Sequence, residues 1–177
     1  MGKGTHKTLI ALVVLLVIII IWALVQRSGP PSVATDPAGA EVLIYLATRD
    51  GTSLVPVKRI VDVEKVSPQG LIEELLKGPR PGEPWVLPLP ANTRLQSVAV
   101  VDRVAYVDLS EEMIEFHPGG TTGELLTVYA VVNTLAQLPE VELVQIFVGG
   151  RELETLMGHL DLRTPLEPDF SLVIEEH

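Results

Sequence analysis

Hydrophobic residues divide the chain into one unbroken apolar run and a longer stretch in which apolar and polar positions alternate. From Leu9 to Val25 no residue is charged, and Leu, Val and Ile dominate. A helix rises about 1.5 Å per residue, so such a run covers most of a ~30 Å hydrocarbon core. Trp22 lies near its end, where an indole prefers the membrane–water boundary. The pattern predicts a transmembrane helix over residues 9–26.

The flanks of this segment set its predicted orientation. Lys3 and Lys7 precede it and only Arg27 follows closely, which places residues 1–8 in the cytoplasm and the rest of the chain outside. A cleaved signal peptide is the alternative. Its apolar region is usually 7–15 residues long and ends in a small-residue site, and neither feature is evident here. We therefore expect an uncleaved signal anchor.

Residues 27–40 are rich in proline, glycine and small polar residues and lack apolar periodicity, as is typical of a linker. The domain is predicted to span residues 41–177. Its first elements form a hairpin, with strands over 42–46 and 54–61 around the turn Arg49-Asp50-Gly51. In the second strand Val55, Val57, Ile60 and Val61 alternate with basic residues.

Two amphipathic helices and three further strands follow. Ser67-Pro68 predicts a helix start and Gly78-Pro79 its end. Thr121 and Glu124 have the spacing of a capping box, and they open a second helix. The apolar stripe of that helix is expected to consist of Leu125, Val128, Tyr129, Val132 and Leu135. The strands are predicted over residues 95–101, 104–109 and 141–148.

Shorter elements complete the pattern. Ser110 is expected to cap a short acidic helix, and residues 170–174 could form one more strand. The order of elements predicts an α+β fold: one mixed sheet with two helices packed on one face, preceded by the N-terminal transmembrane helix.

Charge narrows the choice of partners. The first 27 residues hold three of the 13 basic residues and no acid, so ten basic residues face 23 acidic ones in the remainder. A domain with a net charge of about −13 repels phosphate backbones and anionic lipid headgroups. We therefore expect no nucleic-acid partner.

Candidate chemistry is sparse. The chain has no cysteine, and only His117 and His159 lie inside the domain away from its end, each beside a single acidic residue. Two such scattered pairs are weak evidence for a metal site. Glu111, Glu112 and Glu115 would share one helical face, but acids in a first helical turn ordinarily complement the helix dipole. Gly119-Gly120 before a helix could cradle an anion, although Glu124 would oppose it. The sequence predicts no catalytic, cofactor-binding or metal-binding residue.

Five short motifs occur in an order that resembles a known family. They are Leu75-Leu76-Lys77-Gly78-Pro79, residues 87–93 (LPLPANT), residues 105–110 (AYVDLS), Gly119-Gly120-Thr121 with Glu124, and Asn133-Thr134-Leu135 with Pro139 and Val144. Together they resemble the germane (GerMN) domain of bacterial sporulation and spore germination proteins and related envelope lipoproteins. The motif residues, to which the resemblance gives a structural role, are Gly78, Pro79, Pro90, Asp108, Leu109, Gly119, Gly120, Glu124 and Thr134.

The resemblance implies a non-enzymatic envelope domain that serves in protein assembly, similar in fold to the ring-building domains of spore-forming secretion complexes. This chain carries a single such unit and has an apolar span where the best-known members have a lipobox cysteine. We therefore expect a single-pass protein of the bacterial cell membrane, held there by its N-terminal helix, with the domain outside. Its expected partners are other envelope proteins, with self-association left open. The alternative function is a small-ligand or cell-wall glycan-binding module.

Overall fold

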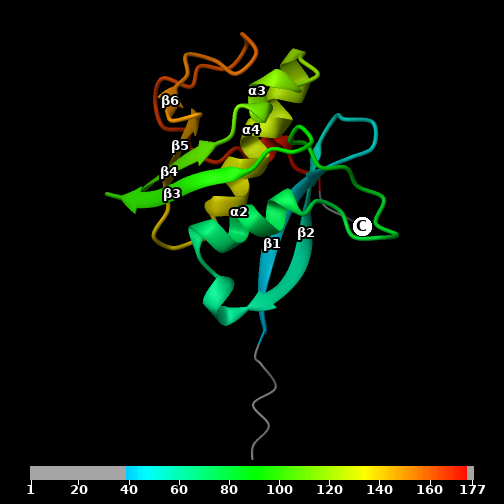
Figure 1. Cartoon of the computed structure of the whole chain (residues 1–177). Coiled ribbons are helices and arrows are strands. Elements are labelled where there is room, and N and C mark those ends of the chain that lie inside the picture. Colours follow the sequence, from blue (N-terminus) through cyan, green and yellow to red (C-terminus); the bar gives the residue numbers. More distant parts are fainter. Residues whose placement is uncertain (1–38, 175–177) are drawn as a thin grey trace, which may run out of the picture. The chain divides into compact units, whose positions relative to one another are not determined.

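The computed structural model describes residues 39–174 (Figure 1). The predicted cytoplasmic tail, the transmembrane segment 9–26 and the linker up to residue 38 lie outside the described residues. Between residues 39 and 174, no helix combines the length and hydrophobicity needed to cross a bilayer.

A β-hairpin opens the described part of the chain, as predicted. Strand β1 (Gly39–Ala47) pairs antiparallel with β2 (Leu54–Asp62) around a turn in which Gly51 has a positive φ. A 3-10 turn, η1 (Val63–Lys65), leads into helix α2 (Pro68–Leu76). The helix begins as the sequence indicates, because the Ser67 hydroxyl accepts a hydrogen bond from the amide of Gly70 at 3.2 Å.

The remaining strands form a separate mixed sheet of four strands in the order β3-β4-β5-β6. Strands β3 (Leu95–Val101) and β4 (Val104–Leu109) form a second antiparallel hairpin. Strand β5 (Leu143–Val148) lies parallel to β4, and the short β6 (Arg151–Glu152) pairs antiparallel with β5. Two parallel strands cannot be joined by a tight turn, so the chain crosses from β4 to β5 through helix α4 (Thr121–Leu135).

The prediction of a single sheet is wrong, although the α+β class and the mixed sheet are confirmed. The β1–β2 hairpin does not pair with the four-stranded sheet. Helix α4 contacts β1, α2 and β5, so it lies between the hairpin and the sheet (Figure 1). The hairpin strands could not be assigned to a sheet from their pattern, because periodicity reports burial and not the pairing partner.

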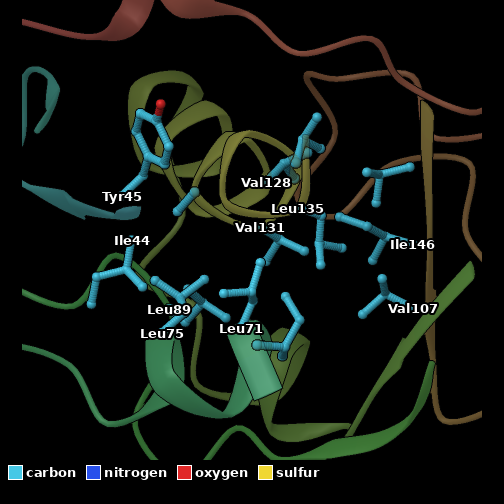
Figure 2. Close-up of a cluster of buried hydrophobic side chains, with 14 of the residues drawn as sticks. Ile44, Tyr45, Leu71, Leu75, Leu89, Val107, Val128, Val131, Leu135 and Ile146 are labelled. Atoms are coloured by element: carbon cyan, nitrogen blue, oxygen red, sulfur yellow. The ribbon is translucent and has the colours of Figure 1, made fainter. Parts of the chain in front are cut away.

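Helix α4 is therefore buried around most of its circumference instead of along one stripe. In Figure 2 its residues Val128, Val131 and Leu135 point among side chains from α2, β1 and both parallel strands. Leu125 and Tyr129, predicted to face the core, are only partly buried. A helix that is apolar on all sides is typical of an element enclosed by others. Its buried residues are Glu124, Leu126, Thr127, Val128, Ala130, Val131, Val132, Asn133, Thr134 and Leu135.

Polar side chains at the end of α4 cover the free edge of β1. The Thr134 hydroxyl accepts a hydrogen bond from the Tyr45 amide at 3.2 Å. The Gln137 side chain donates to the Leu43 carbonyl at 2.6 Å and accepts from the Leu43 amide at 2.9 Å. Because an unpaired strand edge is costly to bury and prone to aggregate, these bonds fix the hairpin against the helix in one register.

Three local predictions are also wrong. Helix α3 (Glu112–Glu115) begins after Glu111, and the Ser110 hydroxyl instead accepts from the Arg94 amide at 2.9 Å. Helix α4 has Gly120 as its N-cap, so Thr121 and Glu124 form no capping box. Residues 170–172 form the 3-10 turn η2 (Phe170–Leu172) and no strand, since the Asp169 carboxylate accepts from the Ser171 amide at 2.8 Å and turns the chain.

The burial of α4 predicts a large cost for a charge in its middle. Val132 is fully buried, so Val132→Asp should lower the free energy of unfolding by about 4 kcal/mol. Thr122→Asp, an exposed change in the first turn of the same helix, should leave it almost unchanged. Urea denaturation of residues 39–177, followed by circular dichroism, measures both. Equal midpoints for the two variants would contradict the enclosed position of α4.

Candidate functional site

The predicted motif residues do not converge on one site; they lie where elements join. At one end of the sheet, the Asp108 carboxylate accepts from the Gly150 amide at 2.9 Å, and the Leu109 carbonyl accepts from the Gly149 amide at 2.8 Å. Gly149 has a φ of +60°, and a Cβ there would lie 3.0 Å from the Glu111 side chain. These contacts close the end of β4 against the turn that follows β5.

The other motif residues stabilise separate turns. Gly78, with a φ of +69°, ends α2 and packs closely on Leu87, while Pro79 follows it. The Pro90 carbonyl accepts from the Thr93 hydroxyl at 2.8 Å, and Thr134 binds β1 as described above. These contacts position the backbone where the elements join.

Glu124 is a fully buried carboxylate that organises the segment after the sheet. Its Oε1 accepts from the amides of Leu156 and Met157, and its Oε2 accepts from that of His159, all at 2.9 Å. Burial alone would raise the pKa of Glu124, but these amides and that of Leu160 bind the charged form and hold its pKa below 4.5. The sequence predicted a helix cap here, and the structure instead shows a long-range anchor.

His117 is a buried link between a loop and α4. Its Nδ1 accepts from the Gly119 amide at 2.9 Å, so its Nε2 carries the proton and lies 3.0 Å from the Thr127 hydroxyl. That hydroxyl donates to the Pro88 carbonyl at 2.6 Å. Burial lowers the pKa of His117, and the charge of nearby Glu124 offsets only part of this lowering. Within residues 39–174, no three His, Cys, Asp or Glu side chains gather as a metal site would require.

A buried ion-pair network beside α2 was missed from the sequence. Arg59 is 2% exposed, and its guanidinium binds the Glu83 carboxylate through two bonds of 2.7 and 2.6 Å. Hydrogen bonding to Arg59 lowers the pKa of Glu83 although burial opposes it. The predicted pattern groups Ile60 with Val55, Val57 and Val61, whereas Ile60 is 62% exposed. Strict period-two counting from Val55 and Val57 would have placed Arg59 on the buried face.

The same network borders an open cavity of about 390 Å³. Glu74, itself buried, accepts from Lys77 at 2.6 Å and from Arg80 at 3.3 Å. Burial would raise the pKa of Glu74, but Lys77 and Arg80 hold it below its usual range. Three basic and two acidic side chains line the cavity, and ion pairs join Asp62 to Lys65 and Glu74 to both Lys77 and Arg80. The lining residues are Ile60, Val61, Asp62, Lys65, Glu74, Lys77, Gly78, Pro79, Arg80 and Pro81.

The four-stranded sheet has one covered face and one open face. Ala105, Val107 and Leu109 of β4 are fully buried toward the helices, whereas Tyr106 on the opposite face is 38% exposed. Tyr106 and Phe147 form a tilted aromatic pair, with ring centroids 6.3 Å apart. They border a shallow hollow of about 260 Å³. We call this region the outer sheet face and define it by Ser97, Ala99, Tyr106, Asp108 and Phe147.

Comparison with known proteins identifies relatives of the chain. Residues 43–154 match the Germane family, which is described by the words sporulation and spore germination. No curated protein matches the chain in sequence. A candidate lipoprotein from Clostridium perfringens has a similar structure, with 26% identity and a TM-score of 0.54 over 73% of this chain and 88% of that one.

Two structures of the sporulation protein GerM from Bacillus subtilis share the fold. Its tandem GerMN domains are 21% identical, with a TM-score of 0.60 over 78% of this chain and 49% of theirs. Its first GerMN domain is 22% identical, with a TM-score of 0.57 over 73% of this chain and 96% of that domain. The chain thus spans about half the length of the tandem structure.

Replacing the buried carboxylate predicts a local and pH-dependent loss of stability. Glu124→Gln keeps the shape but places an NH₂ group among amide donors, so it should cost about 2–3 kcal/mol and speed hydrogen exchange at residues 156–160. The charged form contributes fully above pH 4.5, and this contribution disappears as the pH falls through the lower folded pKa. The difference between the two proteins should therefore shrink in acid.

Glu154→Gln is the matched control. The Glu154 side chain is exposed. Its backbone carbonyl accepts a hydrogen bond from the Leu162 amide at 2.8 Å, and the substitution leaves this bond in place. Exchange rates that rise equally in both variants would contradict the anchoring role of Glu124.

Proposed function

Because the chain belongs to the Germane family, we propose that it is a single-pass membrane protein whose outer domain binds other envelope proteins and has no catalytic centre. The observation that carries this proposal is the open side of the four-stranded sheet. Apolar groups remain accessible there on Tyr106 and Val101, which are 38% and 54% exposed. An exposed apolar patch on a folded domain commonly marks a protein-binding surface.

The rest of the domain supports binding over chemistry. The carboxylate of Glu124 and the imidazole of His117 both form hydrogen bonds inside the fold. The two terminal nitrogens of the Arg59 guanidinium likewise bind Glu83, whereas its Nε has no hydrogen-bond partner among the described residues. These groups stabilise the fold that carries the outer sheet face, and none of them pairs a nucleophile with an adjacent base.

The expected anchor limits where the partner can lie. Residues 28–40, if extended, reach about 45 Å at most. A partner must then be bound to the same membrane or lie in the nearest layer of the wall. Membrane attachment agrees with the likeness to the candidate lipoprotein from Clostridium perfringens.

One observation favours the alternative of glycan binding. Tyr106, Phe147 and Asp108 border the hollow on the outer sheet face, and aromatic rings beside a carboxylate can hold a sugar. However, Asp108 already accepts a bond from the Gly150 amide. The aromatic rings are tilted by 50° to one another, so they offer no continuous stacking surface. Protein binding is the better supported function.

The anchor predicts the topology of the protein in cells. Protease added to intact spheroplasts should digest the domain, and the mature chain should keep its N-terminal residues. A cytoplasmic protein serves as the control for intact spheroplasts. Protection of the domain, or a mature N-terminus near Ser28, would contradict the anchored topology.

The outer sheet face predicts the position of the binding surface. A photoreactive residue at Ala99 should crosslink to other envelope proteins in living cells, whereas the same residue at Glu64, which is exposed on η1, should not. Mass spectrometry of the adducts identifies the partners. Adducts made only of wall glycan at Ala99 would favour the alternative function, and equal protein adducts at both positions would contradict a specific surface.

A further inference from the structure

The charges of the domain are distributed unevenly along the chain. Residues 58–81 hold five of the ten basic residues beyond residue 27 and only four acidic ones, a net charge of +1. The other residues beyond residue 27 include five basic and 19 acidic ones, a net charge of −14. Salt limits the interaction between exposed charges to about 8–10 Å, so the nearest surface decides which partner can approach. The repulsion of anionic lipids expected from the total charge therefore applies to the acidic remainder and not to residues 58–81.

The structure gathers the basic stretch around one cavity. The end of β2, the 3-10 turn η1 and the loop after α2 line the cavity of about 390 Å³. Its basic lining residues are Lys65, Lys77 and Arg80, and each of their side chains is more than half exposed. Each pairs with one carboxylate, and an ammonium or guanidinium has more N–H donors than one carboxylate accepts. Donors therefore remain for an anion outside the chain.

The ion-pair network behind the cavity contains one more base than acids. Glu74 pairs with Lys77 and Arg80 and lies 3.8 Å from the Nε of Arg59. The terminal nitrogens of Arg59 bind Glu83. These three bases and two acids leave one positive charge uncompensated within the network. Since Arg59 is buried, the exposed heads of Lys77 and Arg80 present that charge at the surface.

Two apolar side chains are exposed beside these bases. Ile60 and Val63 are 62% and 60% exposed, the highest values for large apolar side chains among the described residues. Ile60 lines the cavity, and Val63 is the first residue of η1. Apolar side chains next to Lys and Arg are the combination with which proteins bind the interfacial layer of anionic bilayers.

This surface lies where the chain enters the domain. Gly39 opposes Asp62 in the hairpin register, and a Cβ on Gly39 would collide with the Ile60 side chain. The start of β1, the end of β2 and η1 lie together at one end of the domain (Figure 1). Only residues 27–38 separate Gly39 from the predicted transmembrane segment. Along the chain, this end of the domain is thus the part nearest to the predicted anchor.

We propose that Ile60, Val63, Lys65, Lys77 and Arg80 form a docking surface for an anionic lipid bilayer, which we call the chain-entry surface. The three bases bind headgroup phosphates at the mouth of the cavity, while the two apolar side chains enter the interfacial layer. The inference rests on the membrane anchor of the proposed function and deepens it, because docking orients the tethered domain. The acidic remainder of the domain then faces away from the membrane.

A dye on the chain-entry surface tests the docking, since the chain has no cysteine of its own. The full chain with Val63→Cys carries an environment-sensitive dye in vesicles that contain a quencher lipid, made of phosphatidylcholine alone or mixed with phosphatidylglycerol. Quenching should be about fivefold stronger in the anionic vesicles, the factor that one base near an anionic surface supplies. The same dye at Thr52→Cys, exposed at the other end of the hairpin, should be quenched in neither.

A charge reversal with a matched control tests the role of the bases. Lys65 pairs with Asp62 at 3.1 Å on the surface, so Lys65→Glu leaves the ion pairs of Glu74 in place. It should lower quenching in the anionic vesicles at least about fivefold. Arg151→Glu changes the net charge equally, and Arg151 is likewise exposed and paired with one acid, Glu111, at 3.0 Å. The control should leave the quenching unchanged.

The contrary outcomes separate this proposal from the proposed function. Equal quenching in both kinds of vesicle, or an equal loss in both charge variants, would overturn the recognition of lipid charge. A blue shift of the dye without quenching would assign the surface to a protein and overturn lipid docking. A chain that floats with vesicles but shows neither signal would also overturn docking, while protein crosslinks from Ala99 in cells would still support the proposed function. A chain that does not float with vesicles would overturn the anchor and, with it, this inference.

Discussion

The enclosure of α4 is the constraint on which the domain depends. This helix contacts β1 on one side and α2 and β5 on others, so its apolar residues supply the core of both the hairpin and the sheet. Its buried polar residues each hold a different segment: Glu124 binds the amides after Leu156, Asn133 binds the backbone of Asp169, and Thr134 binds β1. A buried polar group that loses its hydrogen-bond partner costs more free energy than the loss of an ordinary apolar contact. These bonds therefore fix the arrangement of the segments as well as stabilise it.

This arrangement determines which surface is left for function. Helices α2 and α4 lie on the inner side of the four-stranded sheet, and within residues 39–174 no helix covers its other face, where Tyr106 and Phe147 stay partly accessible. The edge of β1 is covered by Thr134 and Gln137, whereas the edge of β3 has no such cover in the described part of the chain. Among the described residues, the fold thus covers one edge and leaves the other without a strand partner.

The errors in the sequence-based predictions share one physical cause. The Thr121–Glu124 spacing suits a capping box, but the same carboxylate can bind any amides that the fold brings near, and those of Leu156, Met157 and His159 are 32 to 35 residues away. The sequence does not indicate that Arg59 is buried, because a lone guanidinium is costly to bury and Glu83 compensates its charge from a loop that local patterns do not place. A single sequence contains the donors and acceptors but not their pairing.

The sequence by itself determined the local elements and the family. Alternating apolar residues, the Ser67 cap and the glycine that ends α2 depend on contacts between near neighbours, so both hairpins and both long helices could be predicted. The separation into two sheets, the enclosure of α4, the roles of Glu124 and His117 and the open edge of β3 were decided only by the tertiary structure. Each of these depends on segments far apart in the chain, and the free energy that selects them comes from burial and long-range hydrogen bonds.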